Sequence, residues 1–252
     1  VLVLRMGFAL PFYILIEWFR NKSNDSVATW NKKDIFIMVV MGLLGYYLSS
    51  YLDFIGLQYI TANLERLILF VYPTLTTILS ALILKKKISI NSWLAILICY
   101  VGVFVSFYKQ DHSSPNLALG AFFVFLSALT YSFFLIGSEK LIPKYGAQKF
   151  TSYIMIISCL WVFVHLSIQT PPNLFQFPNE VYFLGLFLAI FCTVLPTYMI
   201  GLAIKILGAS TTSILSMAGP VSVIFLSYFV LNETITVFHL LGTIIVIVGI
   251  LI

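Results

Sequence analysis

The chain has 252 residues, of which 61% are hydrophobic and only 9% are charged. Soluble domains carry roughly 25% charged residues, so this composition excludes a water-soluble protein. The formal net charge of +5 does not indicate a nucleic-acid-binding protein, because the 14 Lys and Arg are dispersed over short polar segments and form no basic face. The three cysteines lie inside apolar runs, with neither disulfide nor metal-site spacing.

Short polar breaks divide the chain into long apolar segments. A helix needs about 20 apolar residues to cross the hydrocarbon core of a bilayer. These runs lack the alternation of barrel strands, and lipid leaves backbone groups no partner outside helices and closed barrels, so we expect helices. The predicted transmembrane helices lie near residues 1–19, 35–57, 64–84, 91–108, 117–138, 148–168, 181–203, 209–231 and 236–252. The sequence therefore predicts an all-α integral membrane protein.

The basic residues are distributed unevenly between alternate loops. If successive loops lie on opposite sides, eleven Lys and Arg fall on one side and two, Arg66 and Lys109, on the other, with Arg5 just inside a span. Positive residues concentrate in cytoplasmic loops, so we expect the Lys-rich loops in the cytoplasm and the protein in the cell (inner) membrane. The eleven are Arg20, Lys22, Lys32, Lys33, Lys85, Lys86, Lys87, Lys140, Lys144, Lys149 and Lys205.

Two parts of the chain resemble each other at a distance of 147 residues. Residues 46–105 align with residues 193–252 without a gap. Leu and Ile pairs match by chance in apolar sequence, so the informative coincidences are those of Tyr, Pro, Ser and Gly. They are Tyr51 with Tyr198, Pro73 with Pro220, Ser80 with Ser227 and Gly102 with Gly249. Such self-similarity indicates an internal structural repeat.

The shift also predicts the domain organisation. It places the span 117–138 on a segment that would precede Val1, so we expect ten helices in the intact protein, nine of them in this chain. Five spans per repeat is an odd number, so the second repeat must enter the membrane from the opposite side. We therefore predict a bundle of two inverted five-helix repeats. Residues 1–108 form the first repeat, 109–116 an external linker, and 117–252 the second repeat.

One sequence pattern resembles a known transporter family. A proline within a span begins a Leu-rich segment, Pro220 to Leu231, which a polar turn, Asn232-Glu233-Thr234, and a Gly-containing apolar helix follow. This is similar to the EamA family of the drug/metabolite transporter superfamily. The first repeat departs from it, with Lys85-Lys86-Lys87 where Glu is usual. The resemblance covers essentially the whole chain and implies ten helices in two inverted repeats and transport, often efflux, of amino acids or related metabolites.

Pro73 and Pro220 each lie about ten residues into a predicted span. A proline there removes a backbone hydrogen bond and frees a carbonyl for a ligand or a neighbouring helix. Inverted-repeat carriers place the substrate near the midplane, where interrupted helices meet. Packing kinks, and Ser or Thr hydrogen bonds between helices worth about 0.6 kcal/mol each, are the alternative interpretation. The candidate pathway residues are Tyr46, Ser49, Asp53, Arg66, Pro73, Thr77, Ser127, Tyr131, Ser216 and Pro220.

Charged residues within spans form a second candidate site. A charge at the bilayer centre costs on the order of 3 kcal/mol, so such residues are candidates for function. Arg5, Asp53, Glu65 and Arg66 should lie toward external helix ends, as a gate or as an ion-pair cluster that anchors those ends. For His165, deep in a span, a neutral hydrogen-bonded side chain is preferred over a proton relay. Glu17 and Lys205, at cytoplasmic helix ends, can extend to the headgroups.

Enzyme motifs are missing from the sequence. It contains no H-E-x-x-H, no G-x-S-x-G and no G-x-x-x-x-G-K-[ST], so we expect neither an enzyme nor an ATP-driven pump, and no cofactor or metal. A flippase for lipids or lipid-linked precursors is the main alternative to a metabolite transporter, and a channel is a weaker one. The partners we expect are a small-molecule substrate and the lipid bilayer, with a homodimer as a possible assembly and no nucleic acid.

Overall fold

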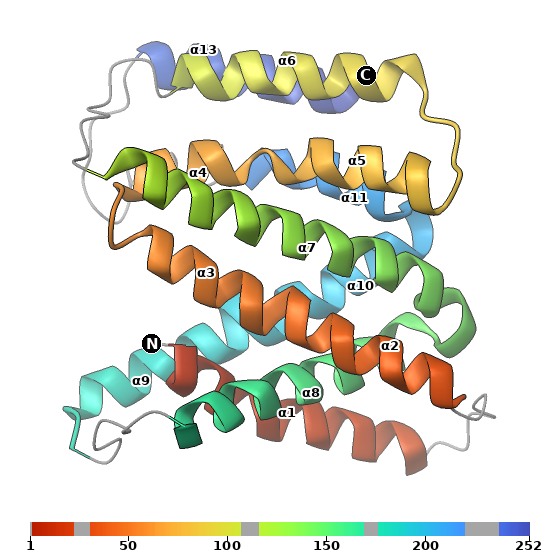
Figure 1. Ribbon diagram of the computed structural model, residues 1–252, viewed down its shortest axis with the longest axis vertical. Coiled ribbons are helices and arrows are strands. Elements are labelled where there is room, and N and C mark those ends of the chain that lie inside the picture. The colour runs from red at the N-terminus through yellow and green to blue at the C-terminus, as the bar shows by residue number, and fades with distance from the viewer. Residues whose placement is uncertain (1, 23–30, 107–115, 169–175, 220–236) are drawn as a thin grey trace. The chain divides into compact units, whose positions relative to one another are not determined.

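The computed structural model describes residues 2–22, 31–106, 116–168, 176–219 and 237–252, and these segments are almost entirely helical (Figure 1). Within them, two shorter apolar helices cover Ile90–Val105 and Leu240–Leu251, and six longer ones are long and apolar enough to cross a membrane. The six are Leu2–Arg20, Lys32–Gly56, Leu64–Ile83, Leu117–Tyr145, Ala147–Ile168 and Asn179–Leu207. The prediction of an all-α membrane protein is confirmed. Pro220, the part of its predicted span that follows it and linker residues 109–115 lie outside the described residues.

The chain folds as two compact units, each built from both halves of the sequence. Unit 1 comprises residues 1–51 and 133–208, and in it α8 packs against four partners. The elements of this unit are α1 (Leu2–Lys22), α2 (Lys32–Gly42), the π-helix η1 (Leu43–Leu48), the end of α7 (Leu117–Tyr145), α8 (Ala147–Ile168), α9 (Asn179–Ala189), the π-helix η2 (Ile190–Val194) and α10 (Leu195–Leu207). The partners of α8 are α1, α2, η1 and α10.

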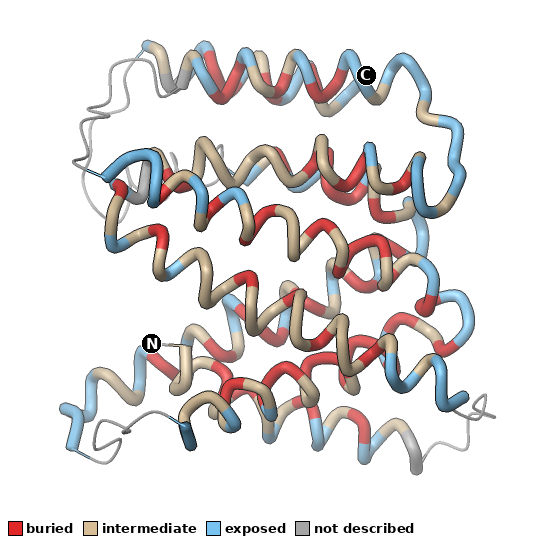
Figure 2. The backbone as a smooth tube through the Cα atoms, in the orientation of Figure 1, coloured by how far each residue is buried: buried red, intermediate tan, exposed pale blue. Residues whose placement is uncertain are grey.

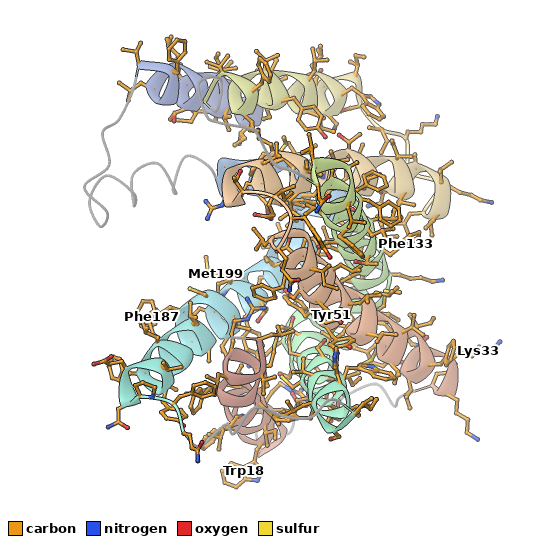
Figure 3. The ribbon with its side chains drawn as sticks, turned by 60° about the vertical axis from the view of Figure 1, so that its left-hand side comes forward. Trp18, Lys33, Tyr51, Phe133, Phe187 and Met199 are labelled. Carbon is orange, nitrogen blue, oxygen red and sulfur yellow. The ribbon has the colours of Figure 1, made fainter. Side chains whose placement is uncertain are left out.

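The buried face of α1 shows why this helix packs in unit 1 (Figure 2). Met6, Ala9, Tyr13 and Glu17 are all buried and follow one another at intervals of three or four residues. That spacing places them on a single helix face. The opposite face carries exposed side chains such as Trp18, which is 56% exposed and extends outward from α1 (Figure 3). The buried face of this helix therefore ends in a charged residue, Glu17, and its outward face is apolar, as expected in lipid.

Unit 2 comprises residues 52–132 and 209–252. Helices α6 and α13 pack along each other in it (Figure 1). A Cβ on Gly102 would lie 2.7 Å from the Val246 side chain, and a Cβ on Gly249 would lie 2.7 Å from Cys99 Sγ. The elements of this unit are most of α3 (Ser49–Gly56), α4 (Ala62–Leu69), α5 (Tyr72–Ile83), α6 (Ile90–Ser106), the first part of α7, α11 (Ala209–Leu215), the 3₁₀-helix η3 (Ser216–Ala218) and α13 (Val237–Leu251).

The helix pair α6 and α13 is reciprocal. Gly102 and Gly249 are 147 residues apart, and so are Cys99 and Val246. Each helix therefore contacts its partner through corresponding positions of the repeat. Residue 102 lies beside 246 while 99 lies beside 249, which makes the two helices antiparallel. These contacts follow the 147-residue shift seen in the sequence. They are the contacts an inverted repeat would make, and the ten-helix inverted arrangement itself stays a prediction.

Two spans contain a π-helical turn at matching positions. Element η1 interrupts the span Lys32–Gly56, and η2 interrupts Asn179–Leu207. Their first residues, Leu43 and Ile190, are again 147 residues apart. A π-helical turn accommodates one extra residue, which rotates the side chains that follow it, and such turns are frequent at functional sites. Periodicity in the sequence does not reveal them.

The span Leu64–Ile83 is interrupted directly before Pro73. Helix α4 ends at Leu69, α5 begins at Tyr72, and Pro73 lies in the first turn of α5. Proline is accepted in a first turn because its missing N–H has no helical partner there. The interruption therefore lies at residues 70 and 71, directly before Pro73.

Candidate functional site

In unit 2, a group of hydroxyl and aromatic side chains surrounds the break before Pro73. The Tyr72 carbonyl accepts hydrogen bonds from Ser132 Oγ at 3.1 Å and from Thr76 Oγ1 at 2.8 Å. The Tyr72 ring meets that of Tyr131 edge to face, with 5.4 Å between centroids. Its phenol is hydrogen-bonded to Ser216. The structure thus brings Tyr131 and Ser216 together around the residue that precedes Pro73.

Pro73 determines the backbone chemistry at this break. Its nitrogen carries no hydrogen, so the Leu69 carbonyl has no donor four residues ahead of it. Pro73 is buried, and Ser127, 3% exposed, lies one helical turn before Tyr131 on α7. Helix ends with free carbonyls beside hydroxyl groups can bind the polar part of a substrate.

Thr77 and Ser80 line the buried face of α5, and both are fully buried. The Thr77 hydroxyl is hydrogen-bonded to Ser210 Oγ at 2.8 Å, which connects α5 to α11. Such a contact is typical of helix packing in membranes. This contact agrees with the packing interpretation, and a place for Thr77 on a substrate pathway stays a prediction.

The predicted charge cluster is divided between the two units. Arg5 belongs to unit 1, where its guanidinium donates to Ser50 Oγ at 3.3 Å. Asp53, Glu65 and Arg66 belong to unit 2. Glu65, in the first turn of α4, is only 6% exposed and is hydrogen-bonded to Asp53. A hydrogen bond between two carboxyl groups requires a proton on one of them.

In unit 1, predicted residue Tyr46 lines a small enclosed cavity. The cavity volume is about 10 Å³, which is room for about one water molecule. Its polar lining also includes Ser138, Thr151 and Thr197, which sequence reasoning missed. The Tyr46 ring packs edge to face on Phe134, 5.1 Å between centroids. Ser49, another predicted residue, is buried and donates to the Gly45 carbonyl within its own span.

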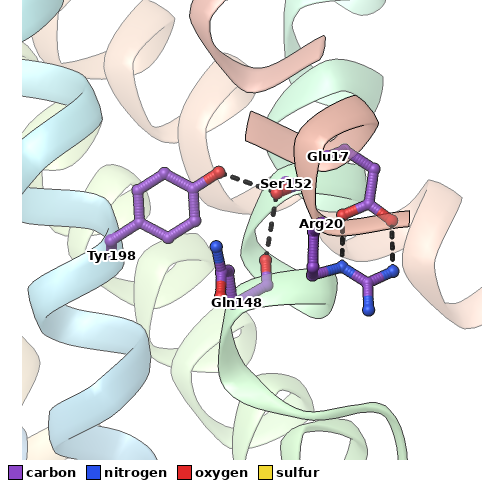
Figure 4. Close-up of polar contacts among 5 residues, drawn as sticks. All are labelled: Glu17, Arg20, Gln148, Ser152 and Tyr198. Atoms are coloured by element: carbon purple, nitrogen blue, oxygen red, sulfur yellow. Dashed lines mark hydrogen bonds and ion pairs between the residues drawn. The ribbon is translucent and has the colours of Figure 1, made fainter. Parts of the chain in front are cut away.

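Further hydroxyl contacts of unit 1 extend from this cavity. The Tyr13 phenol lies 2.7 Å from Thr197 Oγ1, with both side chains buried. The Tyr198 phenol lies 2.7 Å from Ser152 Oγ, which also bonds the Gln148 carbonyl at 3.1 Å (Figure 4). The spacing of Tyr13 and Glu17 on α1 was the available sequence signal for these contacts. Their partners, more than 40 residues away, could not be read from periodicity.

A buried ion pair lies at the Lys-rich end of unit 1. Glu17 is 6% exposed and accepts from Arg20 Nη2 at 2.6 Å and Nε at 3.0 Å (Figure 4). Lys149, also 6% exposed, interacts electrostatically with both groups. The expectation that Glu17 extends to the headgroups is therefore wrong, because a buried carboxylate requires a cationic partner. Lys205 is exposed, as expected for a residue at a helix end.

His165 lies three residues before the end of α8 and not deep in the span. Its Nδ1 is hydrogen-bonded to the Tyr47 hydroxyl, and the Tyr51 ring meets the imidazole at 4.8 Å between centroids. The preference for a hydrogen-bonded histidine agrees with this contact. Within the described residues, no group of three His, Cys, Asp or Glu side chains could hold a metal ion.

The sequence matches a family model, that of the EamA-like transporter family, over residues 1–108 and 118–252. The chain belongs to this family. This EamA-like transporter is therefore a multi-pass membrane transporter, and the resemblance stated from its sequence is confirmed. The family and the names of its relatives describe transport and not catalysis.

Several relatives cover most of this EamA-like chain. It is 27% identical to the "Uncharacterized transporter YcbK" of Bacillus subtilis (strain 168), over 96% of this chain and 78% of the relative. Identity to "Uncharacterized transporter YyaM" of the same organism is 26%, over 98% and 81% of the two chains. A solved crystal structure of a protein has a TM-score of 0.81 at 14% identity, covering 99% of this chain and 85% of that one. At that identity, the likeness concerns the fold alone.

Proposed function

We propose that this EamA-like transporter is a secondary transporter that exports a small metabolite, an amino acid or a related compound, across the cytoplasmic membrane by alternating access. The observation that carries the proposal is the pair of interrupted spans. The π-helices η1 and η2 lie 147 residues apart, and carriers with internal repeats bind substrate where corresponding irregular helices meet. The Lys-rich loops, in this proposal, face the cytoplasm.

The chemistry of the candidate site supports a small polar substrate. The groups around Tyr72 and around the Tyr46 cavity are hydroxyls and aromatic rings. Hydroxyls donate and accept hydrogen bonds, and aromatic rings cover apolar parts, so such a lining suits a zwitterion with a small side chain. A bulky lipid-linked precursor would need a wider path that opens toward the bilayer.

The direct test measures efflux from proteoliposomes that contain the full-length protein. Vesicles are loaded with a panel of labelled amino acids and, in parallel, with fluorescent lipid precursors. We expect efflux of one or more amino acids and no movement of the lipids. Lipid movement in the absence of amino acid efflux would replace the proposal with the flippase alternative. Equal flux of every solute, unsaturable, would indicate a channel.

Pro73→Ala tests whether the break contributes to transport. The alanine N–H can bond the Leu69 carbonyl and join α4 to α5, so we expect efflux to fall by at least about tenfold. The matched control is Pro143→Ala in α7, an exposed proline near the helix end and outside both candidate groups. Equal effects of the two substitutions would mean that the break is only structural.

We further propose that Asp53, Glu65 and Arg66 form part of an external gate. The burial of Glu65 and its interactions with Asp53 and Arg66 support this role, because a charge group that is remade in each cycle must be compensated in each state. Arg66→Ala should lower efflux without lowering the amount of folded protein. Unchanged efflux in this variant would leave the charges a purely structural role.

Energy coupling and assembly belong to the same proposal. We expect facilitated diffusion or exchange, so the internal pH of proteoliposomes, followed with a trapped dye, should not change with substrate flux. A substrate-linked pH change would establish proton coupling instead.

A homodimer is expected to appear as twice the chain mass by light scattering, after correction for detergent.

A further inference from the structure

A surface groove in unit 1 lies between η1 and α8, away from the cavity that Tyr46 lines. Its volume is about 340 Å³, within the range of roughly 300–1,000 Å³ that is typical of small-molecule sites. Leu43 and Tyr47 form one wall, and α8 forms the other with side chains at intervals of three or four residues. The groove is lined by Leu43, Tyr47, Trp161, Val164, His165 and Ile168.

The imidazole in this groove lies near one end of α8. Helices rise 1.5 Å per residue, so His165, three residues before the end of α8, is about 4.5 Å from that end. Trp161 lies one turn deeper, and its indole N–H is already bonded to the Val39 carbonyl at 3.4 Å. The imidazole therefore lies close to this end of α8, with the apolar Leu43, Trp161 and Val164 available to an acyl chain and with Ile168 beyond it. A phospholipid likewise joins polar ester and phosphate groups to apolar chains.

The imidazole of His165 presents a hydrogen-bond donor to this site. Its Nδ1 is bonded to the Tyr47 hydroxyl, and Tyr51 stacks on Tyr47 and meets the imidazole edge to face. In the tautomer in which the Tyr47 phenol donates to Nδ1, the ring proton lies on Nε2. In the part of the chain that the structure describes, no protein group accepts from Nε2. An N–H that faces the apolar side chains of a groove is stabilised by an acceptor bound in the same groove.

We propose that this groove binds one glycerophospholipid of the leaflet at the end of α8 away from Lys149. An ester or phosphate oxygen of the lipid accepts from His165 Nε2, and an acyl chain lies against Leu43, Trp161 and Val164. The donor disfavours an ammonium group, since an N–H repels a cation. The exposed outer wall, with Val164 49% and Ile168 82% exposed, admits a chain from the bilayer. The proposal does not depend on the transported substrate.

The first test counts phospholipids retained by the full-length protein, purified in mild detergent, using native mass spectrometry with added phosphatidylglycerol or phosphatidylethanolamine. We expect one retained lipid per chain. Val164→Trp fills the groove and should reduce retention about fivefold, as should His165→Leu by loss of the donor. The control is Leu160→Trp, since Leu160 is on the same helix, 53% exposed, and does not line the groove. Equal retention in the two tryptophan variants would overturn the proposal.

A second measurement does not depend on substitutions in the groove. Trp18, Trp30 and Trp93 are changed to Phe, so that Trp161 is the single fluorophore. Lipids brominated along the acyl chain should quench Trp161, and unbrominated lipid should reverse the quenching only by slow exchange. The comparison is a variant whose single tryptophan is introduced by Leu160→Trp. If the quenching of Trp161 reverses as fast as in that variant, Trp161 has ordinary bilayer contact and no bound lipid. Absence of quenching would also contradict the site.

Discussion

At the scale of single residues, the hydrogen bond between Tyr13 and Thr197 is directional. Thr197 Oγ1 donates to the Val194 carbonyl at 2.9 Å, so it accepts from the Tyr13 phenol at 2.7 Å. Tyr13 is fully buried and Thr197 is 4% exposed. Removing either side chain therefore has a different effect on the other. Without Thr197 the Tyr13 phenol loses its acceptor, whereas without Tyr13 the Thr197 hydroxyl still donates to the Val194 carbonyl.

Thr197→Val should consequently destabilise the protein more than Tyr13→Phe. The valine leaves the buried phenol without an acceptor, which costs about 1–3 kcal/mol, whereas the phenylalanine removes the donor together with its need for a partner. The measurement is the temperature at which half of the detergent-solubilised protein stays monodisperse. A larger loss for Tyr13→Phe would mean that the phenol has a second partner, or that the direction of the bond is reversed.

The buried pair of Glu17 and Arg20 gives a second prediction at this scale. Arg20→Gln leaves a buried carboxylate without its bidentate partner, and removing one member of such a pair costs on the order of 3 kcal/mol. Lys149 interacts with Glu17 and will limit this loss. Adding Glu17→Gln to Arg20→Gln should restore part of the stability. A thermal double-mutant cycle checks this, and additive losses would show that the two groups are not coupled.

At the scale of elements, close helix contacts depend on glycine. A Cβ at position 102 would lie 2.8 Å from the Gly242 carbonyl oxygen and the Val246 nitrogen, and backbone atoms cannot rotate away. Small residues allow such approach between membrane helices. Gly102→Ala should therefore separate α6 from α13 and lower the thermal stability, by about 1–3 kcal/mol.

Gly219→Ala is the matched control, because no atom of the described residues lies within 4 Å of the Cβ it would add and its φ of −49° suits alanine. We expect it to be neutral or slightly stabilising. Thermal shift in the same detergent compares the two variants directly. Equal stability of Gly102→Ala and Gly219→Ala would mean that α6 and α13 do not pack as closely as their glycines imply.

The elements also show where prediction from sequence reaches its limit. Hydropathy predicts where spans lie because lipid imposes a length and an apolar composition on every helix. The break before Pro73 and the π-helices η1 and η2 depend on single backbone hydrogen bonds, which composition does not encode. The sequence predicts a lost backbone hydrogen bond at Pro73, and the structure has its interruption at residues 70 and 71. Tyr72 was missed, because only its fold neighbours Ser132 and Tyr131 distinguish it from other interfacial tyrosines.

For the whole molecule, the internal repeat predicted more of the structure than any single candidate site did. The 147-residue shift, read from sequence, recurs in the positions of the π-helices and in the reciprocal contacts of α6 with α13. Long-range partners such as Tyr47 with His165 could not be predicted, because residues 118 positions apart share no periodicity. An internal sequence repeat therefore predicts how helices are arranged, whereas a single hydrogen bond between distant residues cannot be recognised in one sequence.

Membrane sidedness is the remaining prediction at this scale. Eleven Lys and Arg on one side against two on the other predict that the loop with Lys85–Lys87 is cytoplasmic and the loop before Asn179 external. Single cysteines are introduced at Ser89 or Asn179, both exposed, after Cys99, Cys159 and Cys192 are replaced by Ala. A membrane-impermeant maleimide applied to intact cells should label position 179, and should label position 89 only after permeabilisation. The opposite pattern would reverse the assigned orientation, and with it the side from which each candidate group is open to substrate.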